Sequence, residues 1–328
     1  MMLNLSLLVS PLAKGAYFAN ILEVAQAELQ TLIGDRPYQM QPRAGLDFID
    51  LEADENSLSA LAQLSFVQGI FLNQGESLVP LAADKHFRLH DDFVFGSKFK
   101  GKTNEILTQL LINVGLNQLN KPTEKLTEAT VSKQKKSDKI KLLDPMCGRA
   151  TTLLWAMRYG LMAKGIEQDP KALGDIRQNL KKWTKLHRQK HQLNEGFIGK
   201  ANKQDKGKFL EFAAEDTSMR VISGNSTDTA QWLKGEKFHL IISDLPYGVQ
   251  HFTTDKTRNP LATLTDCAPG WADSLKPGGV MVLAYNRYIP KREQLIDVFA
   301  QQGLEPVPFE ASHRMSESIV RDIVVFKK

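Results

Sequence analysis

The spacing of hydrophobic and polar positions divides the chain into two parts. Residues 1–95 combine short apolar runs with one segment of helical spacing, and Gly34 follows that segment as a stop. We expect strands at 3–10 and 44–52, a helix at 18–33, and a helix leading into a strand at 57–72. The pattern predicts a small α+β domain over residues 1–95, in which we find no catalytic constellation.

From residue 139 onward, strand-like and helix-like segments alternate. The predicted strands are 139–144, 161–167, 220–224, 238–244 and 279–285. This alternation predicts a parallel sheet covered by helices on both faces, and two consecutive strand-like segments after Leu304 predict a strand pair that ends the sheet. Residues 96–138 connect the two parts and hold a helix and a basic linker. The helix is predicted at 103–115, where Thr103 or Asn104 caps its start and Gly115 ends it.

Composition narrows the class of protein. The 328 residues are 42% hydrophobic and 24% charged, which excludes collagen, a coiled coil and bulk disorder. Two cysteines exclude a disulfide scaffold and fit a reducing compartment, so we expect a cytoplasmic protein. No apolar run approaches the ~18 residues that span a membrane, and the apolar N-terminus lacks a preceding positive charge. We therefore interpret it as a first strand and expect no membrane partner.

Charge is distributed unevenly. Residues 1–95 carry five Lys and Arg against twelve Asp and Glu, whereas the rest carries 37 against 25. The stretch 181–208 alone holds nine basic and two acidic residues. Such a surface attracts polyanions, nucleic acid above all, although lysines on an ordinary solvated face would give the same count.

The first candidate motif is 142–157, in which an apolar strand ends at Asp144, turns through Pro145 to Gly148 and opens a helix near Thr151. Ligands of open α/β sheets lie beyond the carboxyl ends of strands, and glycine lets the backbone approach them. Asp144 would accept from an ammonium group or orient the loop. The motif is neither a dinucleotide nor a Walker fingerprint.

Two further strand ends carry candidate cofactor contacts. Glu167 ends the second strand, where a carboxylate can hold both hydroxyls of a ribose, and Asp169 is then expected to cap the helix begun at Pro170. Asn225 follows the third strand and can hydrogen-bond an adenine edge, although asparagine in a loop commonly serves the turn itself.

The most specific motif follows the fourth strand, where Asp244, Leu245, Pro246 and Tyr247 precede Gly248. An exocyclic amine on a base is a poor nucleophile because its lone pair is delocalised. Hydrogen bonds to the Asp244 carboxylate and the Leu245 carbonyl would bias the nitrogen towards tetrahedral geometry and stabilise the developing charge. Tyr247 offers a flat face for an unstacked base. These four residues are the candidate catalytic group.

DPMCGRATT, GIEQDP and DLPYG together resemble class I S-adenosylmethionine-dependent methyltransferases, and within them the RNA methylases allied to THUMP-domain tRNA guanine-N2 methyltransferases. The resemblance covers about residues 100–328. It implies a Rossmann-like seven-stranded sheet whose last strand is antiparallel. It also implies a cofactor site. The cofactor-binding residues expected from it are Asp144, Pro145, Cys147, Gly148, Thr151, Glu167, Asn225 and Asp244.

Three positions depart from the family pattern. Ala150 replaces a usual glycine, so its methyl group would either crowd the cofactor or simply replace a permissive residue. Asn225 replaces a common aspartate, and Leu245 replaces the first proline of the catalytic motif, a change seen in RNA-directed members.

The resulting prediction is an S-adenosylmethionine-dependent enzyme that methylates an exocyclic amine of a tRNA or rRNA base, guanine N2 first, with no metal ion. Lys256, Arg258 and the stretch 181–208 would hold phosphates, and Arg149 would stabilise the cofactor loop. Adenine N6 in DNA or RNA and a protein glutamine are alternative targets. A non-catalytic RNA-binding factor on the same fold is the alternative of a different class.

Overall fold

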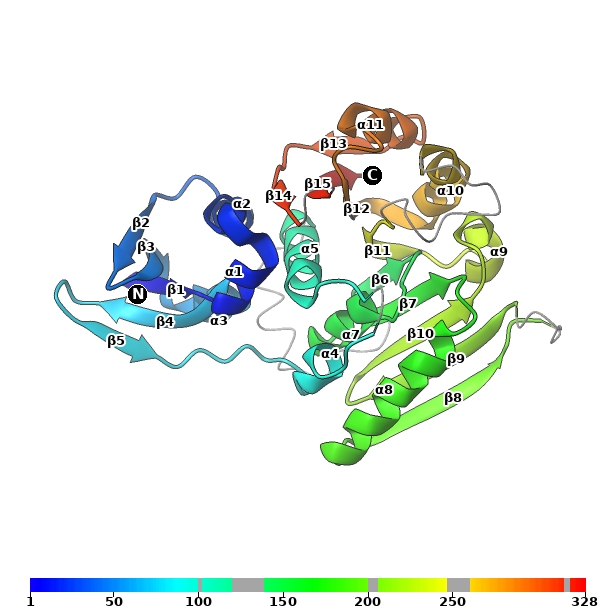
Figure 1. Ribbon diagram of the computed structural model, residues 1–328, viewed down its shortest axis with the longest axis horizontal. Coiled ribbons are helices and arrows are strands. Elements are labelled where there is room, and N and C mark those ends of the chain that lie inside the picture. Colours follow the sequence, from blue (N-terminus) through cyan, green and yellow to red (C-terminus); the bar gives the residue numbers. More distant parts are fainter. Residues whose placement is uncertain (100–101, 120–138, 200–205, 247–259, 316–318) are drawn as a thin grey trace.

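The computed structural model describes residues 1–99, 102–119, 139–199, 206–246, 260–315 and 319–328, and they form two sheets (Figure 1). Tyr247, Gly248, Lys256, Arg258 and most of the predicted linker lie outside the described residues. How residues 1–95, 96–138 and 139–328 divide into domains stays a proposal.

The N-terminal part is α+β, as predicted. Its sheet is antiparallel in the order β2-β3-β1-β4-β5. The strands are β1 (Met2–Val9), β2 (Tyr38–Arg43), β3 (Leu46–Asp54), β4 (Val67–Asn73) and β5 (Leu78–Leu81). The helices are α1 (Pro11–Tyr17), α2 (Ile21–Ile33), which ends at Gly34, and α3 (Leu58–Ala62), with 3-10 turns η1 (Phe18–Asn20) and η2 (Glu55–Ser57).

The larger sheet has the order β13-β15-β12-β11-β6-β7-β10-β9-β8, with β14 beside β15. Its strands are β6 (Lys141–Asp144), β7 (Met162–Glu167), β8 (His191–Phe197), β9 (Lys208–Ala214), β10 (Thr217–Ser223), β11 (Phe238–Asp244), β12 (Leu275–Asn286), β13 (Glu305–Val307), β14 (His313–Arg314) and β15 (Val320–Lys327). Neighbours from β10 to β12 are parallel, whereas β15 runs antiparallel to β12. The predicted Rossmann-like fold with an antiparallel last strand is confirmed.

The sheet extends further than the resemblance implies. An antiparallel hairpin of β8 and β9 joins its edge beyond β10. Sequence analysis predicted no strand between residues 167 and 220, because Gly196 and many polar residues mask the alternation in β8. Strand β8 lies at the edge, where few side chains are buried, so its residues show little hydrophobic periodicity.

Helices cover both faces of the larger sheet because successive strand residues point to opposite faces. Leu142 packs in a core that includes α5 (Glu105–Gln118), α7 (Thr151–Arg158) and α8 (Ala172–Leu186). Leu143 packs in a second core under α10 (Leu261–Ser274) and α11 (Arg292–Ala300). The short helices α4 (Asp92–Phe95) and α9 (Thr229–Leu233) and the 3-10 turn η4 (Ser226–Asp228) complete the described elements.

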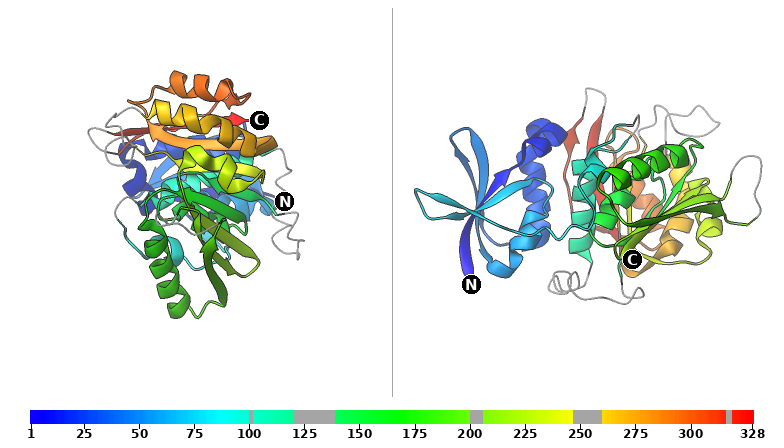
Figure 2. Two further views of the ribbon diagram at one scale, coloured as in Figure 1. Left: turned by 90° about the vertical axis from the view of Figure 1, so that its right-hand side faces the viewer. Right: turned by 90° about the horizontal axis from the view of Figure 1, so that it is seen from below.

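Helix α5 lies between the two sheets and packs against α2 as well as β11 and β12 (Figure 2). Asn104 caps it as predicted, since its Oδ1 accepts the N–H groups of Ile106 and Leu107 at 3.0 Å. The predicted end at Gly115 is wrong, because the helix continues to Gln118. A Cβ on Gly115 would lie 2.9 Å from the Ile242 side chain, so this glycine allows α5 to approach the sheet.

Candidate functional site

A pocket of about 280 Å³ opens beyond the carboxyl ends of β6, β7, β10 and β11. The chain leaves β6 towards β7 and later returns to its other side with β11, so the pocket lies where the strand order reverses. Its lining is Lys102, Thr103, Pro145, Met146, Gly148, Arg149, Ile166, Glu167, Gln168, Asp169, Gly224, Asn225, Ser226, Asp244, Leu245, Pro246, Thr263, Met315 and Arg321. One cavity therefore joins the Gly148 turn to Asp244.

The Gly148 turn is fixed by contacts with the end of β7. Gly148 has φ +52°, and a Cβ placed on it would have no atom within 4 Å. Its N–H donates to the Glu167 carboxylate at 2.8 Å. Arg149 forms ion pairs with Asp169 at 2.6 Å and Asp175 at 2.9 Å, which supports its predicted role in holding the loop. The turn thus leaves open space beside a rigid backbone.

Glu167 lines the pocket, and each of its carboxylate oxygens accepts a hydrogen bond from a backbone N–H group. Besides Gly148, the N–H of Asp169 donates to it at 2.8 Å. A carboxylate has about four acceptor sites, so two remain for a ligand. Asp169 in turn accepts from the Lys171 N–H at 3.0 Å, one residue before α8 begins.

Ala150 adopts the left-handed conformation that explains the usual glycine. Its φ is +64° and ψ is +27°, and the residue is fully buried. It is absent from the pocket lining. The methyl group therefore replaces a permissive residue and does not crowd the pocket, at a cost of about 1 kcal/mol in backbone strain.

Three predicted cofactor residues lie behind the pocket wall. Asp144, Cys147 and Thr151 are buried and absent from the lining. Asp144 accepts from the Met146 N–H at 3.1 Å and the Ser243 hydroxyl at 2.8 Å. Burial raises the pKa of Asp144 to about 7, and it raises the pKa of the Cys147 thiol well above its usual range. Of the two roles considered for Asp144, orienting the loop matches its contacts.

Asn225 lies in the lining next to η4. Its Oδ1 accepts the Thr227 N–H at 3.1 Å, and its backbone carbonyl accepts from the Trp232 indole at 3.0 Å. Turn chemistry therefore occupies the side-chain oxygen. The Nδ2 group is the part of the amide that can donate to a ligand such as adenine.

At the other end of the pocket, Asp244 and Arg321 form an ion pair. The Arg321 guanidinium lies 3.3 Å from the Asp244 carboxylate, and only 6% and 7% of their side-chain surfaces are exposed. The Leu245 N–H donates to the Ala284 carbonyl at 2.8 Å, which ties the motif to β12. Leu245 and Pro246 lie in the lining, and Tyr247 lies outside the described residues.

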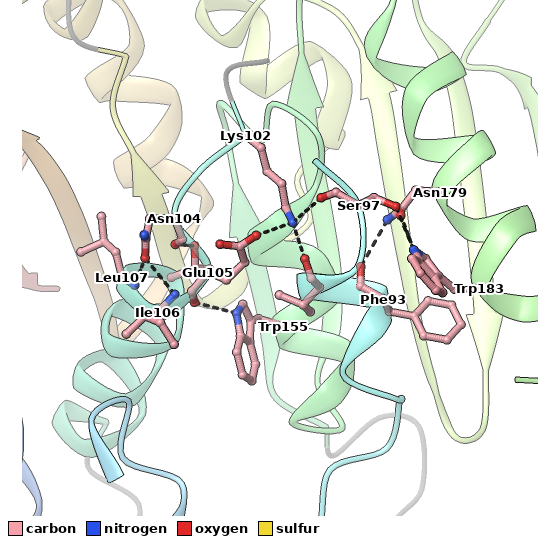
Figure 3. A network of polar contacts seen from close by, with 12 residues as sticks. Phe93, Ser97, Lys102, Asn104, Glu105, Ile106, Leu107, Trp155, Asn179 and Trp183 are labelled. Carbon is pink, nitrogen blue, oxygen red and sulfur yellow. Dashed lines mark hydrogen bonds and ion pairs between the residues drawn. The ribbon is translucent and has the colours of Figure 1, made fainter. Parts of the chain in front are cut away.

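Sequence analysis missed the wall formed by Lys102 and Thr103. The Lys102 ammonium donates to the Glu105 carboxylate at 2.5 Å, to the Ser97 carbonyl at 2.9 Å and to the Val94 carbonyl (Figure 3). These bonds hold the segment before α5 against the pocket. Thr103 was considered only as a helix cap. Its place in the sequence just before a capped helix was the available signal.

The predicted phosphate-binding stretch begins on the last turns of α8. Lys181, Lys182, Lys185, Arg188 and Lys190 are all exposed. Residues 176–194 contain no acidic residue. Residues 181–190 thus bring five exposed positive side chains to the C-terminal end of this helix.

No protein-family model matches the sequence, and no curated protein matches it. Among the described residues, no helix has both the length and the apolar character needed to cross a bilayer.

Similar solved structures include a TehB-like SAM-dependent methyltransferase from Corynebacterium glutamicum ATCC 13032 Kitasato, with 15% identity, a TM-score of 0.37, and coverage of 62% of this chain and 86% of that one. TrmN from Thermus thermophilus is 13% identical with a TM-score of 0.42, over 90% of this chain and 61% of that one. The rRNA methyltransferase aviRa from Streptomyces viridochromogenes is 14% identical with a TM-score of 0.42, over 73% and 90%.

Proposed function

We propose that this protein is an S-adenosylmethionine-dependent N-methyltransferase that acts on an exocyclic amine of a tRNA or rRNA base, with guanine N2 as the favoured target. The observation that carries the proposal is the single cavity that joins the Gly148 turn and Glu167 to Asp244. A methyl transfer needs such a cavity, because donor and acceptor must meet within one enclosed space.

The residues at the Gly148 end fit S-adenosylmethionine. Glu167 retains acceptor capacity for a ribose diol, and the Asn225 Nδ2 group can donate to adenine. The open space above Gly148 admits the methionine end close to the backbone. When bound, the cofactor supplies a methyl group activated on a sulfonium. We propose a supporting role for Asp144, Cys147 and Thr151, which keep the turn in shape.

At the acceptor end, the Asp244 carboxylate would accept a hydrogen bond from the substrate amine. The Leu245 carbonyl, held by the proline that follows it, would accept a second one. Arg321 fixes the carboxylate from β15, so that its orientation is set before substrate binds. Two fixed acceptors draw the amine lone pair out of conjugation with the base.

The positive end of α8 supports a nucleic-acid substrate. Lys181 and Lys185 are four residues apart on α8 and therefore lie on one face, and the exposed Arg188 follows just beyond the end of the helix, so all three can contact phosphates. We propose RNA as the partner and the cytoplasm as the location, since both cysteines are free.

The test is transfer of tritiated methyl from S-adenosylmethionine to total RNA from a strain that lacks the protein, followed by nucleoside mass spectrometry. We expect label in N2-methylguanosine. Label in N6-methyladenosine would move the target to adenine, and label that appears only when a protein extract replaces the RNA would move it to glutamine. Cofactor binding by calorimetry without label in any of them would identify a non-catalytic factor.

A further inference from the structure

The side chains of two histidines and an aspartate lie close together near the N-terminal end of α4. His90 lies just before that helix, Asp92 is its first residue, and His187 caps the C-terminal end of α8. One ligand atom from each of the three lies within 4.8 Å of the others. None of them lines the pocket, so this cluster, which we call the His–Asp cluster, is separate from the proposed methyl-transfer site.

Two separations in the His–Asp cluster are close to those between ligand atoms of a metal ion. The Asp92 Oδ2 atom lies 2.9 Å from His187 Nε2 and 3.5 Å from His90 Nδ1. Ligand bonds of about 2.0–2.2 Å to tetrahedral zinc place neighbouring ligand atoms about 3.3 Å apart. The two observed separations lie on either side of that value.

His90 must reorient to bind an ion. Its Nδ1 lone pair accepts the Asp92 N–H at 3.1 Å, so this hydrogen bond has to give way before that nitrogen can coordinate a metal. The two imidazole rings stack with centroids 3.7 Å apart. His90 is half exposed and can turn out of this stack to direct its nitrogen at a shared ion.

The cluster completes a seam between α8 and the segment before α5. Asn179 donates to the Phe93 carbonyl at 3.2 Å, and Trp183 donates to the Ser97 hydroxyl at 2.9 Å (Figure 3). His187 follows at the same four-residue spacing and meets Asp92. The segment held by this seam continues to Lys102 and Thr103, which form one wall of the pocket.

We propose that His90, Asp92 and His187 bind one divalent transition-metal ion, with zinc as the best match, and that this ion clamps the segment before α5 to the end of α8. Two imidazoles and one carboxylate suit zinc, cobalt or nickel, whereas magnesium and calcium prefer oxygen ligands alone. Three protein ligands leave a fourth position for water. The proposal does not depend on the methyltransferase activity.

The test is calorimetric titration of the full-length, untagged, chelator-treated protein with zinc chloride. We expect one equivalent to bind and the melting temperature to rise, because the ion binds only the folded state. His90→Ala and His187→Ala should each weaken binding by at least about tenfold. His191→Ala is the matched control, since this exposed histidine lies four residues on and should leave the affinity unchanged. Magnesium chloride should produce no binding.

His90→Ala removes an exposed side chain, so its folding should be intact even if the packed His187 tolerates replacement poorly. The proposal is overturned if the wild type binds zinc no more tightly than His90→Ala, or if His191→Ala weakens binding as much as His90→Ala does. It is also overturned if zinc leaves the melting temperature of the wild type unchanged.

Discussion

The two ends of the pocket are built in different ways. At the cofactor end, hydrogen bonds and an ion pair connect residues that lie close together in the sequence, at the ends of the adjacent strands β6 and β7. These residues are Gly148, Arg149, Glu167 and Asp169. At the acceptor end, Asp244 depends on Arg321, which lies 77 residues further along the chain. The cofactor end is therefore locally organised, whereas the acceptor end requires the complete sheet with its last strand in register.

This difference predicts that substitutions at the two ends of the pocket impair different properties of the protein. Changes at the cofactor end should reduce ligand affinity and leave the rest of the fold intact. Changes at the acceptor end should lower the stability of the sheet whichever partner of the ion pair is removed, and loss of Asp244 should in addition abolish transfer.

Asp244→Ala should have the largest effect on activity. Loss of the carboxylate removes the acceptor that activates the amine, so transfer to RNA should fall at least about 100-fold. Affinity for S-adenosylmethionine should stay within a few-fold of wild type. Initial rates of tritium transfer and calorimetry on the same preparations check both statements, and unchanged transfer would remove Asp244 from the mechanism.

Arg321→Ala should destabilise the fold. Both partners are almost fully buried, and removal of one leaves an uncompensated charge, which costs about 3 kcal/mol in the free energy of unfolding. Urea denaturation measures this change. Arg287→Ala, at an exposed arginine beside the same strand pair, should shift stability by less than about 0.5 kcal/mol. Adding Asp244→Asn to Arg321→Ala should recover part of the loss, and a further loss instead would contradict the ion-pair account.

Glu167→Ala should act on the cofactor. Removal of hydrogen bonds to a charged acceptor should weaken S-adenosylmethionine binding by about tenfold or more. The Gly148 N–H also loses its acceptor, so the effect includes a looser turn. Calorimetry checks the affinity, with Glu195→Ala, at an acidic residue on edge strand β8, as control. Equal affinities for Glu167→Ala and the control would place the ribose elsewhere.

Ala150→Gly should have the smallest effect. Relief of left-handed strain, about 1 kcal/mol, is opposed by loss of a buried methyl group, about 0.8 kcal/mol, and by greater freedom of the unfolded chain. Stability should change by less than about 1 kcal/mol and cofactor affinity should be unchanged. An increase in affinity of tenfold would show that the methyl group reaches the cofactor after all.

The sequence predicted what local patterns encode. The strands around Asp144, Glu167 and Asp244 could be identified because apolar runs end in polar turn residues, and β11 has the predicted bounds. Partners that meet only through the tertiary fold were not predictable in this way. Arg321 reaches Asp244 through the pairing of β15 with β12, and His187 meets Asp92 across 95 residues. The edge strand β8 was missed because its exposed residues need no hydrophobic alternation.

The central claim is that one cavity holds donor and acceptor, and a crystal structure of the complex with S-adenosylhomocysteine tests it most directly. The account predicts the ribose hydroxyls within hydrogen-bond distance of Glu167, the adenine beside Asn225, and the sulfur on the side of the cavity that faces Asp244. A ligand bound away from Glu167, or a sulfur separated from Asp244 by the protein wall, would contradict it.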